Sequence, residues 1–276
     1  DDIAKSIENA KTMTELEDIY RPFRPKRKTR ASVAKALGLE PLANAIYAQE
    51  KGTPAPEILA EDYLTDEVPD IESALQGAKD IIAELVSDDP NGRKLIRYAV
   101  HNNGMLTSKG ADDDLGVYEM YKEYSEPVKS IAGHRVLAVN RGEKEGKLKV
   151  SIDFDKTIAT DLLFNIHCKN NTKATDLVIE AVEDSFSRLI FPSIEREIRN
   201  ELTDKACESS IKVFGENTRQ LLMQPPVKGN VTIGLDPGYR TGCKVAVISE
   251  TGKVLDTGVI YPAPPHNKID EAKKTI

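Results

Sequence analysis

The sequence predicts a mainly α-helical, multi-helix domain with one inserted β-hairpin, followed by an antiparallel β-meander. Three observations lead to this fold class. Apolar residues recur at helical spacing through most of residues 1–228, the first predicted domain. A two-residue repeat of apolar side chains interrupts that spacing at residues 148–154. Residues 229–276, the second predicted domain, contain three short β-branched runs separated by glycine turns.

The first forty residues predict short helices with the rhythm of a helix-turn-helix motif. Residues 13–20 have an apolar helical pattern, and the two prolines within residues 21–25 prevent its continuation. Ser32 can cap a second helix, which ends at Gly38, and Pro41 starts a third helix.

Two longer helices are predicted next. Residues 72–86 carry apolar side chains at helical spacing. Asp89-Pro90 opens another helix, which the Asn-Asn-Gly of residues 102–104 stops. Shorter helical pieces are predicted for residues 107–134.

A β-hairpin is predicted at about residues 135–155. Apolar side chains at positions 148, 150, 152 and 154 alternate with polar ones, which is the repeat of a half-buried strand. The apolar run Val136–Val139 is the predicted partner strand, and the two glycines of residues 141–146 provide the turn between them.

Residues 176–189 predict an amphipathic helix, and a long helix follows from Pro192 to just before Pro225-Pro226. At 1.5 Å per residue, about thirty residues make a rod of roughly 45 Å. Such a helix more often braces a structure than binds a ligand. The double proline and the Gly229-Asn230 that follows mark the predicted boundary between the two domains.

The β-meander begins with residues 231–235, which place Asp236 at the end of a strand beside the turn Pro237-Gly238. Residues 243–248 and 253–260 are the second and third predicted strands. An acid beside a glycine turn lets a phosphate or a phosphate-bound metal approach closely, because the turn has little side-chain bulk. The simpler alternative is that Asp236 only caps this turn.

The motif Leu-Asp-Pro-Gly followed by a hairpin is similar to two groups of proteins: the RuvC-like nucleases, and the actin, hexokinase and sugar-kinase group. Cleavage of a phosphodiester by two metal ions needs several converging carboxylates. Glu250 and Asp256 occupy a turn and a strand position that give no reason to expect either near Asp236. We therefore predict no catalytic residue, no metal site and no cofactor, and none of the four histidines has metal-ligand spacing.

The composition, 39% hydrophobic and 30% charged, is that of an ordinary globular protein. No secretory signal and no run of about 18 apolar residues is present, so we expect no membrane association. Three cysteines without a Cys-x-x-Cys pair fit a reducing compartment, and the cytoplasm is the expected location. The chain begins at Asp1 and ends inside a predicted helix, so both ends are expected to be cuts in a longer protein.

The formal net charge is −7, but one basic segment departs from this balance. Residues 19–39 contain seven basic residues and no acid, a charge of +7 that leaves −14 elsewhere. We predict that this segment contacts nucleic-acid phosphates through Arg24, Lys26, Arg27, Lys28 and Arg30. The alternative is that its arginines pair with acids and cement helix packing. Tyr20 and Phe23 are expected to anchor the core, with base stacking as the alternative.

Four segments together resemble hallmark segments of the bacterial Tex family, in the family's order. They are residues 16–42 (LEDIYRPFRPKRKTRASVAKALGLEPL), 134–143 (HRVLAVNRGE), 193–199 (SIEREIR) and 234–247 (GLDPGYRTGCKVAV). The resemblance implies a helical N-terminal region, a YqgF (RuvC-like) domain, helix-hairpin-helix elements and a C-terminal OB-fold RNA-binding domain, the last two lying outside this sequence. Asp236 then holds the first-strand acid position of an incomplete YqgF domain, which implies no catalysis.

The leading hypothesis is therefore a nucleic-acid-binding scaffold that acts as a transcription accessory protein. The resemblance implies RNA or DNA as the partner, bound weakly by these residues, and RNA polymerase as a further candidate partner. Two alternatives stay open: a metal-dependent RuvC-like nuclease, and a protein-binding helical platform for RNA polymerase or a ribonuclease. We expect the chain not to be an enzyme, because one acid cannot complete a two-metal site.

Overall fold

The computed structural model describes residues 2–24, 28–225, 229–238 and 240–276. The chain divides into two compact units, Asp1–Ile211 and Lys212–Ile276. The predicted domain boundary at residues 228/229 stays a prediction, because residues 226–228 lie outside the described ranges. Within those ranges, no helix is both long enough and apolar enough to span a membrane.

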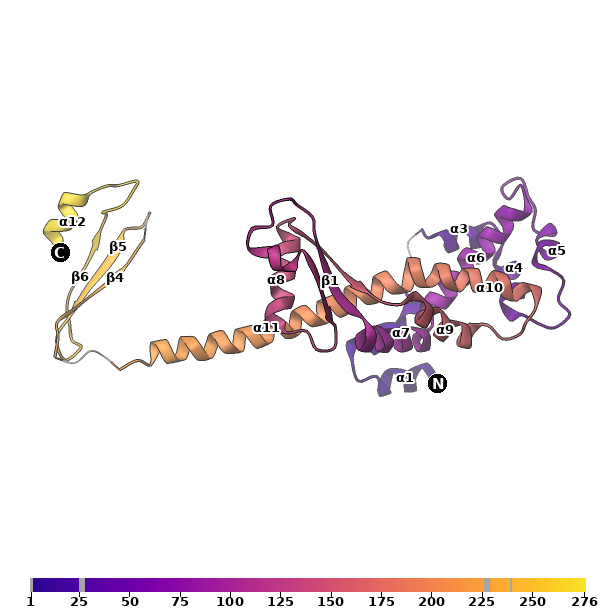
Figure 1. Cartoon of the computed structure of the whole chain (residues 1–276), viewed down its shortest axis with the longest axis horizontal. Coiled ribbons are helices and arrows are strands. Elements are labelled where there is room, and N and C mark those ends of the chain that lie inside the picture. The colour runs from indigo at the N-terminus through magenta and orange to yellow at the C-terminus, as the bar shows by residue number, and fades with distance from the viewer. Residues whose placement is uncertain (1, 25–27, 226–228, 239) are drawn as a thin grey trace. The chain divides into compact units, whose positions relative to one another are not determined.

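Short helices open the first unit (Figure 1). Capping side chains fix where several of them begin. Thr12 accepts a hydrogen bond from the backbone N–H of Glu15, and Thr29 forms a capping box with Ser32. Asp89 accepts hydrogen bonds from the first N–H groups of its helix. The elements are α1 (Asp2–Asn9), α2 (Met13–Tyr20), the 3₁₀ turn η1 (Arg21–Phe23), α3 (Arg30–Ala36), α4 (Glu40–Ala48), α5 (Pro56–Glu61), α6 (Ile71–Asp88) and α7 (Pro90–Asn103).

Helix α6 lies at the centre of the first unit. Ala74, Ala78, Ile82 and Val86 recur every four residues along one face, and each is at most 1% exposed. Helices α3, α4 and α10 (Lys173–Asp184) pack against α6. The helix predicted for residues 72–86 is thus confirmed, and the core of the unit is built on its buried face.

A three-stranded antiparallel sheet follows, with β1 (Met105–Gly110) between β2 (Glu123–Pro127) and β3 (Leu148–Asp153). A 3₁₀ turn, η2 (Gly116–Tyr121), precedes β2. The side chains of β3 alternate between buried and exposed, as the two-residue repeat predicts.

The predicted hairpin at about residues 135–155 is wrong in its first strand. Residues Gly133–Lys144 form the helix α8, and β3 pairs with β1 instead. Val136, Val139 and Gly142 are three residues apart and buried, so this run forms a helix face. Gly142 lies so close to β3 that a Cβ atom there would come within 2.6 Å of Leu148 Cδ1.

The short helices predicted for residues 107–134 are also wrong where β1 and β2 occur. Strand β1 buries Leu106 and Ser108 on one face. Ser108 can occupy this core position because its hydroxyl donates a hydrogen bond of 2.7 Å to the backbone oxygen of Tyr121. The polar inward residue removes the apolar alternation that would have predicted a strand.

The remaining helices of the first unit are α9 (Lys156–His167), α10, a π-helical turn η3 (Ser185–Ile190) and the part of α11 (Phe191–Leu222) up to Ile211. Helix α11 confirms the predicted long helix and buries Ile194, Ile198 and Ala206. Its Arg199 contacts α8 and β3, since it binds Glu143 at 2.5 Å and donates to the backbone oxygen of Val150 over 3.2 Å.

The second unit contains the predicted antiparallel meander. Strands β4 (Thr232–Asp236), β5 (Cys243–Ile248) and β6 (Val254–Ile260) pair in the order β4-β5-β6. Helix α12 (Ile269–Thr275) packs against β6, where Ile260 and Ala272 are each 5% exposed. The structure thus confirms a mainly helical fold that ends in a β-meander, with a three-stranded sheet in place of the inserted hairpin.

Candidate nucleic-acid interface

The basic segment, residues 19–39, begins at the end of α2, includes η1 and α3, and is attached to α6 at two points. Arg21 Nε lies 3.4 Å from Asp88 Oδ1, and the Thr29 hydroxyl donates to Glu84 Oε1 over 3.0 Å. Pro22 occupies the first turn of η1, and the backbone becomes extended at the next residue after that turn. The two attachment points on α6 are four residues apart, so they lie on one face of that helix.

The predicted binding residues differ from the rest of the basic segment in their partners. Arg24, Lys28 and Arg30 are exposed, and no ion pair joins any of them to another described residue. Lys26 and Arg27, which complete the predicted set, lie outside the described residues. The two flanking cations are paired: Arg21 with Asp88, and Lys35 with Glu40 at 2.9 Å.

The two flanking cations therefore form ion pairs, as the alternative interpretation predicts. The three described candidate residues have their charged groups exposed to solvent instead. Burial lowers the pKa of the Arg21 guanidinium, and the nearby charge of Arg93 lowers it further, while Asp88 opposes both. Arginine nevertheless stays charged at neutral pH.

The structure does not gather the three described candidates in one pocket. Lys28 and Arg30 line a cavity of about 770 Å³ that also contains acids of α6. Arg24 lines a separate cavity of about 600 Å³. Because Asp70 and Asp80 share the first cavity, a polyanion would meet Lys28 and Arg30 at the outer surface rather than inside it.

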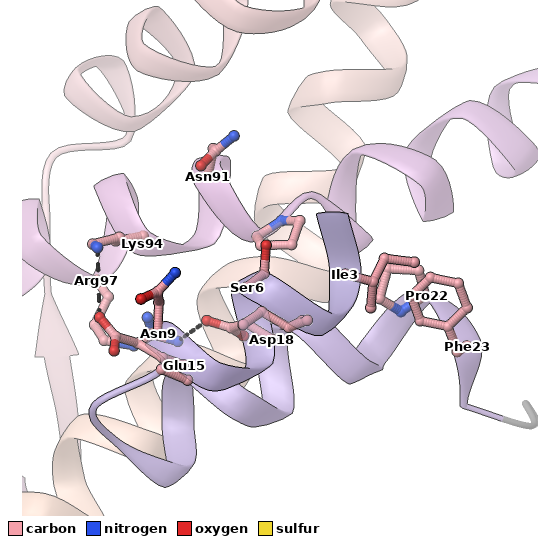
Figure 2. A pocket seen from close by; sticks show the side chains of 13 residues that line it. Ile3, Ser6, Asn9, Glu15, Asp18, Pro22, Phe23, Asn91, Lys94 and Arg97 are labelled. Carbon is pink, nitrogen blue, oxygen red and sulfur yellow. Dashed lines mark hydrogen bonds and ion pairs between the residues drawn. The ribbon is translucent and has the colours of Figure 1, made fainter. Parts of the chain in front are cut away.

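Tyr20 and Phe23 are not core anchors, and that expectation is wrong. Tyr20 is 55% exposed and Phe23 is 57% exposed. Phe23 lines a groove of about 490 Å³ between α1, α2, η1 and α7. Figure 2 shows Ile3, Pro22 and Phe23 at one end of this groove, with Glu15, Lys94 and Arg97 at the other.

A buried ion network fixes α2 beneath the groove. Asp18 is 6% exposed and accepts hydrogen bonds of 2.6 Å from both Arg93 and Arg97. Arg97 also binds Glu197 of α11, and Arg93 donates to Ser193 at 3.2 Å. Burial opposes the charge of Arg97, but hydrogen bonds to Glu197 and Asp18 outweigh it and raise the pKa of this guanidinium.

Sequence reasoning missed this network, because the side chains that bind each other are 75 or more residues apart. The one local signal is an acid, Asp18, inside an apolar helical pattern. Breaking one partner of such a buried group leaves an uncompensated charge, so the network secures the helix that carries the basic segment.

Three polar residues of the segment at 134–143, Arg135, Asn140 and Glu143, form structural hydrogen bonds. Arg135 Nη1 donates to both carboxylate oxygens of Glu126 at 2.9 Å. Glu143 pairs with Arg199, which also binds Asn140 Oδ1 at 3.1 Å. Two of the segments that carry the family resemblance are thus joined to each other by side chains.

His167 is a second buried group that the sequence did not reveal. It is 3% exposed, and its Nδ1 lies 2.9 Å from the Tyr47 hydroxyl. Its Nε2 lies 3.7 Å from Asp89 Oδ2. Burial lowers the pKa of this imidazole, and Asp89 opposes that shift. His167 therefore links α9 to α4 through the Tyr47 hydroxyl and lies near the start of α7.

Asp236 ends β4, opposite Lys244 on β5. Asp256 lies opposite Val247, three residues further along β5, which places it about 10 Å away along the sheet. Glu250 follows the far end of β5. Among the described residues, no three His, Cys, Asp or Glu side chains are grouped so as to hold a metal ion.

Most of the sequence matches two known protein families. Residues 51–214 match the family described as Tex central region-like, and residues 230–276 match the Tex protein YqgF-like domain. All of the chain aligns with the uncharacterized protein YdcI of Bacillus subtilis, at 48% identity over 285 residues.

Two further relatives have more descriptive names. The transcriptional accessory protein Tex of Neisseria gonorrhoeae is 33% identical over 285 residues, which is 100% of this chain. The human S1 RNA-binding domain-containing protein 1 is 32% identical over 282 residues, which is 94% of this chain. The chain spans 39% of the Bacillus protein, 37% of the gonococcal protein and 28% of the human protein.

Proposed function

The chain belongs to the Tex family, and from that membership we propose that it is part of a nucleic-acid-binding transcription accessory protein. Two of its relatives carry the names transcriptional accessory protein and S1 RNA-binding domain-containing protein. These names supply the class of activity. The basic segment supplies a place for it in this chain.

The observation that carries the proposal is the set of unpaired cations at Arg24, Lys28 and Arg30. They are exposed and without an ion-pair partner among the described residues, in a chain whose net charge is −7. Exposed cations that neutralise phosphates release counterions, and this gives affinity without reading a base sequence. The segment therefore contributes a weak, sequence-independent contact with RNA or DNA.

The helical unit acts as the scaffold for this contact. The Asp18 network holds α2 in place, and the two attachments to α6 hold Arg21 and Thr29 of the basic segment. RNA polymerase is the second proposed partner, and the cytoplasm is the proposed location, where Cys168, Cys207 and Cys243 stay as free thiols. A RuvC-like nuclease would depend on Asp236 alone among the acids described at the meander.

Fluorescence anisotropy of the 276-residue chain with labelled RNA and DNA tests the proposal. The triple variant Arg24→Gln, Lys28→Gln and Arg30→Gln should weaken binding to every sequence alike. Each lost phosphate contact should reduce the slope of log K against log salt by about 0.7–0.9. With Mg²⁺ present, the labelled strands should remain intact.

The matched control changes three exposed cations elsewhere, Lys51, Lys129 and Arg219, to glutamine. Both variants lose the same net charge, so a general electrostatic effect would weaken them equally. Equal loss in the two variants, or an unchanged salt slope in the first, would contradict a local contact at the basic segment.

A further inference from the structure

Two aromatic side chains of the basic segment are exposed to solvent. Tyr20 and Phe23 are more than half exposed. A single exposed aromatic residue is common and needs no explanation. Here two lie three residues apart, at the end of α2 and in η1, and residues at that spacing share one helix face.

The turn that presents these rings is fixed in place. Pro22 restricts the backbone between them, and the N–H of Arg24 donates to the oxygen of Arg21 over 3.3 Å. Arg21 itself is held by Asp88. Because little backbone freedom remains to be lost, a flat ligand could stack on these rings at a small entropic cost.

The groove beside Phe23 has one apolar and one polar end, as Figure 2 shows. Its volume of about 490 Å³ falls within the range of small-molecule sites. Asn9 and Asn91 line it, are exposed, and have side-chain amides without a hydrogen bond to other described residues. Such amides offer both donors and acceptors, as the edge of a nucleobase requires.

The charges of the groove favour a base over a phosphate inside it. Glu15 pairs with Lys94 at 3.4 Å, and Asp18 binds Arg97 at 2.6 Å, so acids and bases in the lining compensate each other. Arg24, directly after Phe23, is exposed and has no ion-pair partner among the described residues. A strand could thus place a base at the ring and a phosphate at the adjacent guanidinium.

We propose that Phe23, together with Tyr20, is a stacking site for the unpaired bases of a single-stranded nucleic acid whose phosphates contact Arg24. This inference rests on the proposed function and names its substrate class. Every base has a π-face, so stacking selects single strands without selecting a sequence. In a duplex the same bases are covered by their neighbours, and only the phosphate contacts remain.

Three labelled ligands of equal length test the proposal on the 276-residue chain: a single strand, a duplex, and an abasic strand with the same sugar-phosphate backbone. The chain should bind the single strand at least about fivefold more tightly than the abasic strand. Phe23→Ala should abolish that preference and leave abasic binding unchanged. Phe23→Trp should keep the preference, whereas Phe23→Leu, which is apolar but not aromatic, should lose it.

Phe214→Ala, at a phenylalanine 70% exposed on α11, is the matched control and should change nothing. Equal wild-type affinity for the normal and abasic strands would overturn stacking while leaving the phosphate contact in place. An unchanged preference in Phe23→Ala would do the same. Absence of binding to all three ligands would overturn both the stacking site and the proposed function, and would favour a protein partner for the groove.

Discussion

The two three-stranded sheets of the molecule are alike in size and antiparallel pairing but differ in how far they are covered. In the first unit, β1 and β3 bury every second side chain, and Leu106 is 2% exposed. In the second unit, every residue of β4 is exposed, and Leu235 is 58% exposed. Strand pairing alone therefore does not make a sheet part of a hydrophobic core. Burial of apolar side chains on one face of the sheet supplies the larger stabilisation.

The edges of the two sheets show the same difference. The outer edge of β3 is satisfied by side chains of α11, since Ile152 N–H donates to Glu195 Oε1 at 2.8 Å and Arg199 donates to the oxygen of Val150. No such side-chain hydrogen bond reaches the described backbone of β4. An uncovered edge is open to pairing with a further strand.

The largest expected effect compares one leucine in each sheet. Leu106→Ala should cost about 2–5 kcal/mol of unfolding free energy, because it leaves a cavity in a closed core. Leu235→Ala should stay within about 0.5 kcal/mol, because the side chain is already mostly in water. Circular dichroism during denaturation measures the first, and amide hydrogen exchange in β4–β6 measures the second. Equal costs would contradict the contrast between the sheets.

A smaller effect is expected at the capped edge of β3. Glu195→Ala removes the acceptor of the Ile152 N–H, and an unsatisfied buried donor costs about 1–3 kcal/mol. Glu195→Gln is the control, because its amide oxygen can still accept this hydrogen bond. If the denaturation midpoint falls equally for both variants, Glu195 stabilises the fold through its charge and not through its hydrogen bond to the Ile152 N–H.

The smallest expected effect is a pH dependence limited to the first unit. The pKa of His167 is lowered by burial, so the unfolded chain takes up the proton first as the pH falls. Its contribution to stability is complete above the unfolded value near 6.5 and is lost progressively below it. Melting temperatures between about pH 7.5 and pH 5 should therefore fall less steeply for His167→Gln. His266→Gln, at an exposed histidine of the second unit, should leave the slope unchanged.

Local signals were sufficient for much of the fold. Asp89 caps the start of α7 where the sequence predicts it, and the glycine turns delimit the meander. The predicted cap Ser32 is wrong, because Thr29 caps α3 and Ser32 is the third residue of that helix. The failures have physical causes. Residues 136–139 were predicted as a strand because four consecutive apolar residues fit both the helical and the strand repeat. Strand β1 was not predicted because its polar residue Ser108 is buried through a hydrogen bond that only the tertiary structure supplies.

Of the candidate site, only the clustering of basic residues within residues 19–39 could be predicted from the sequence. Sequence identifies the cations, but not which of them are paired, since Asp88 lies 67 residues after Arg21 and the pairing depends on packing of α6. It also placed Tyr20 and Phe23 in the core. An apolar face on a short helix predicts that another element can pack against it. Whether the face is buried depends on the presence of that element in the fold.

The attachment of the basic segment to α6 has a consequence for how it can vary. Arg21 and Thr29 are held at Asp88 and Glu84, about 6 Å apart along one helix, so the chain between them is a closed loop. The entropy of closing a loop grows slowly with length, by about 0.6 kcal/mol for each doubling. Insertions between the two attachment points would therefore cost the fold little, and the number of charges that this loop carries can change in evolution almost independently of stability.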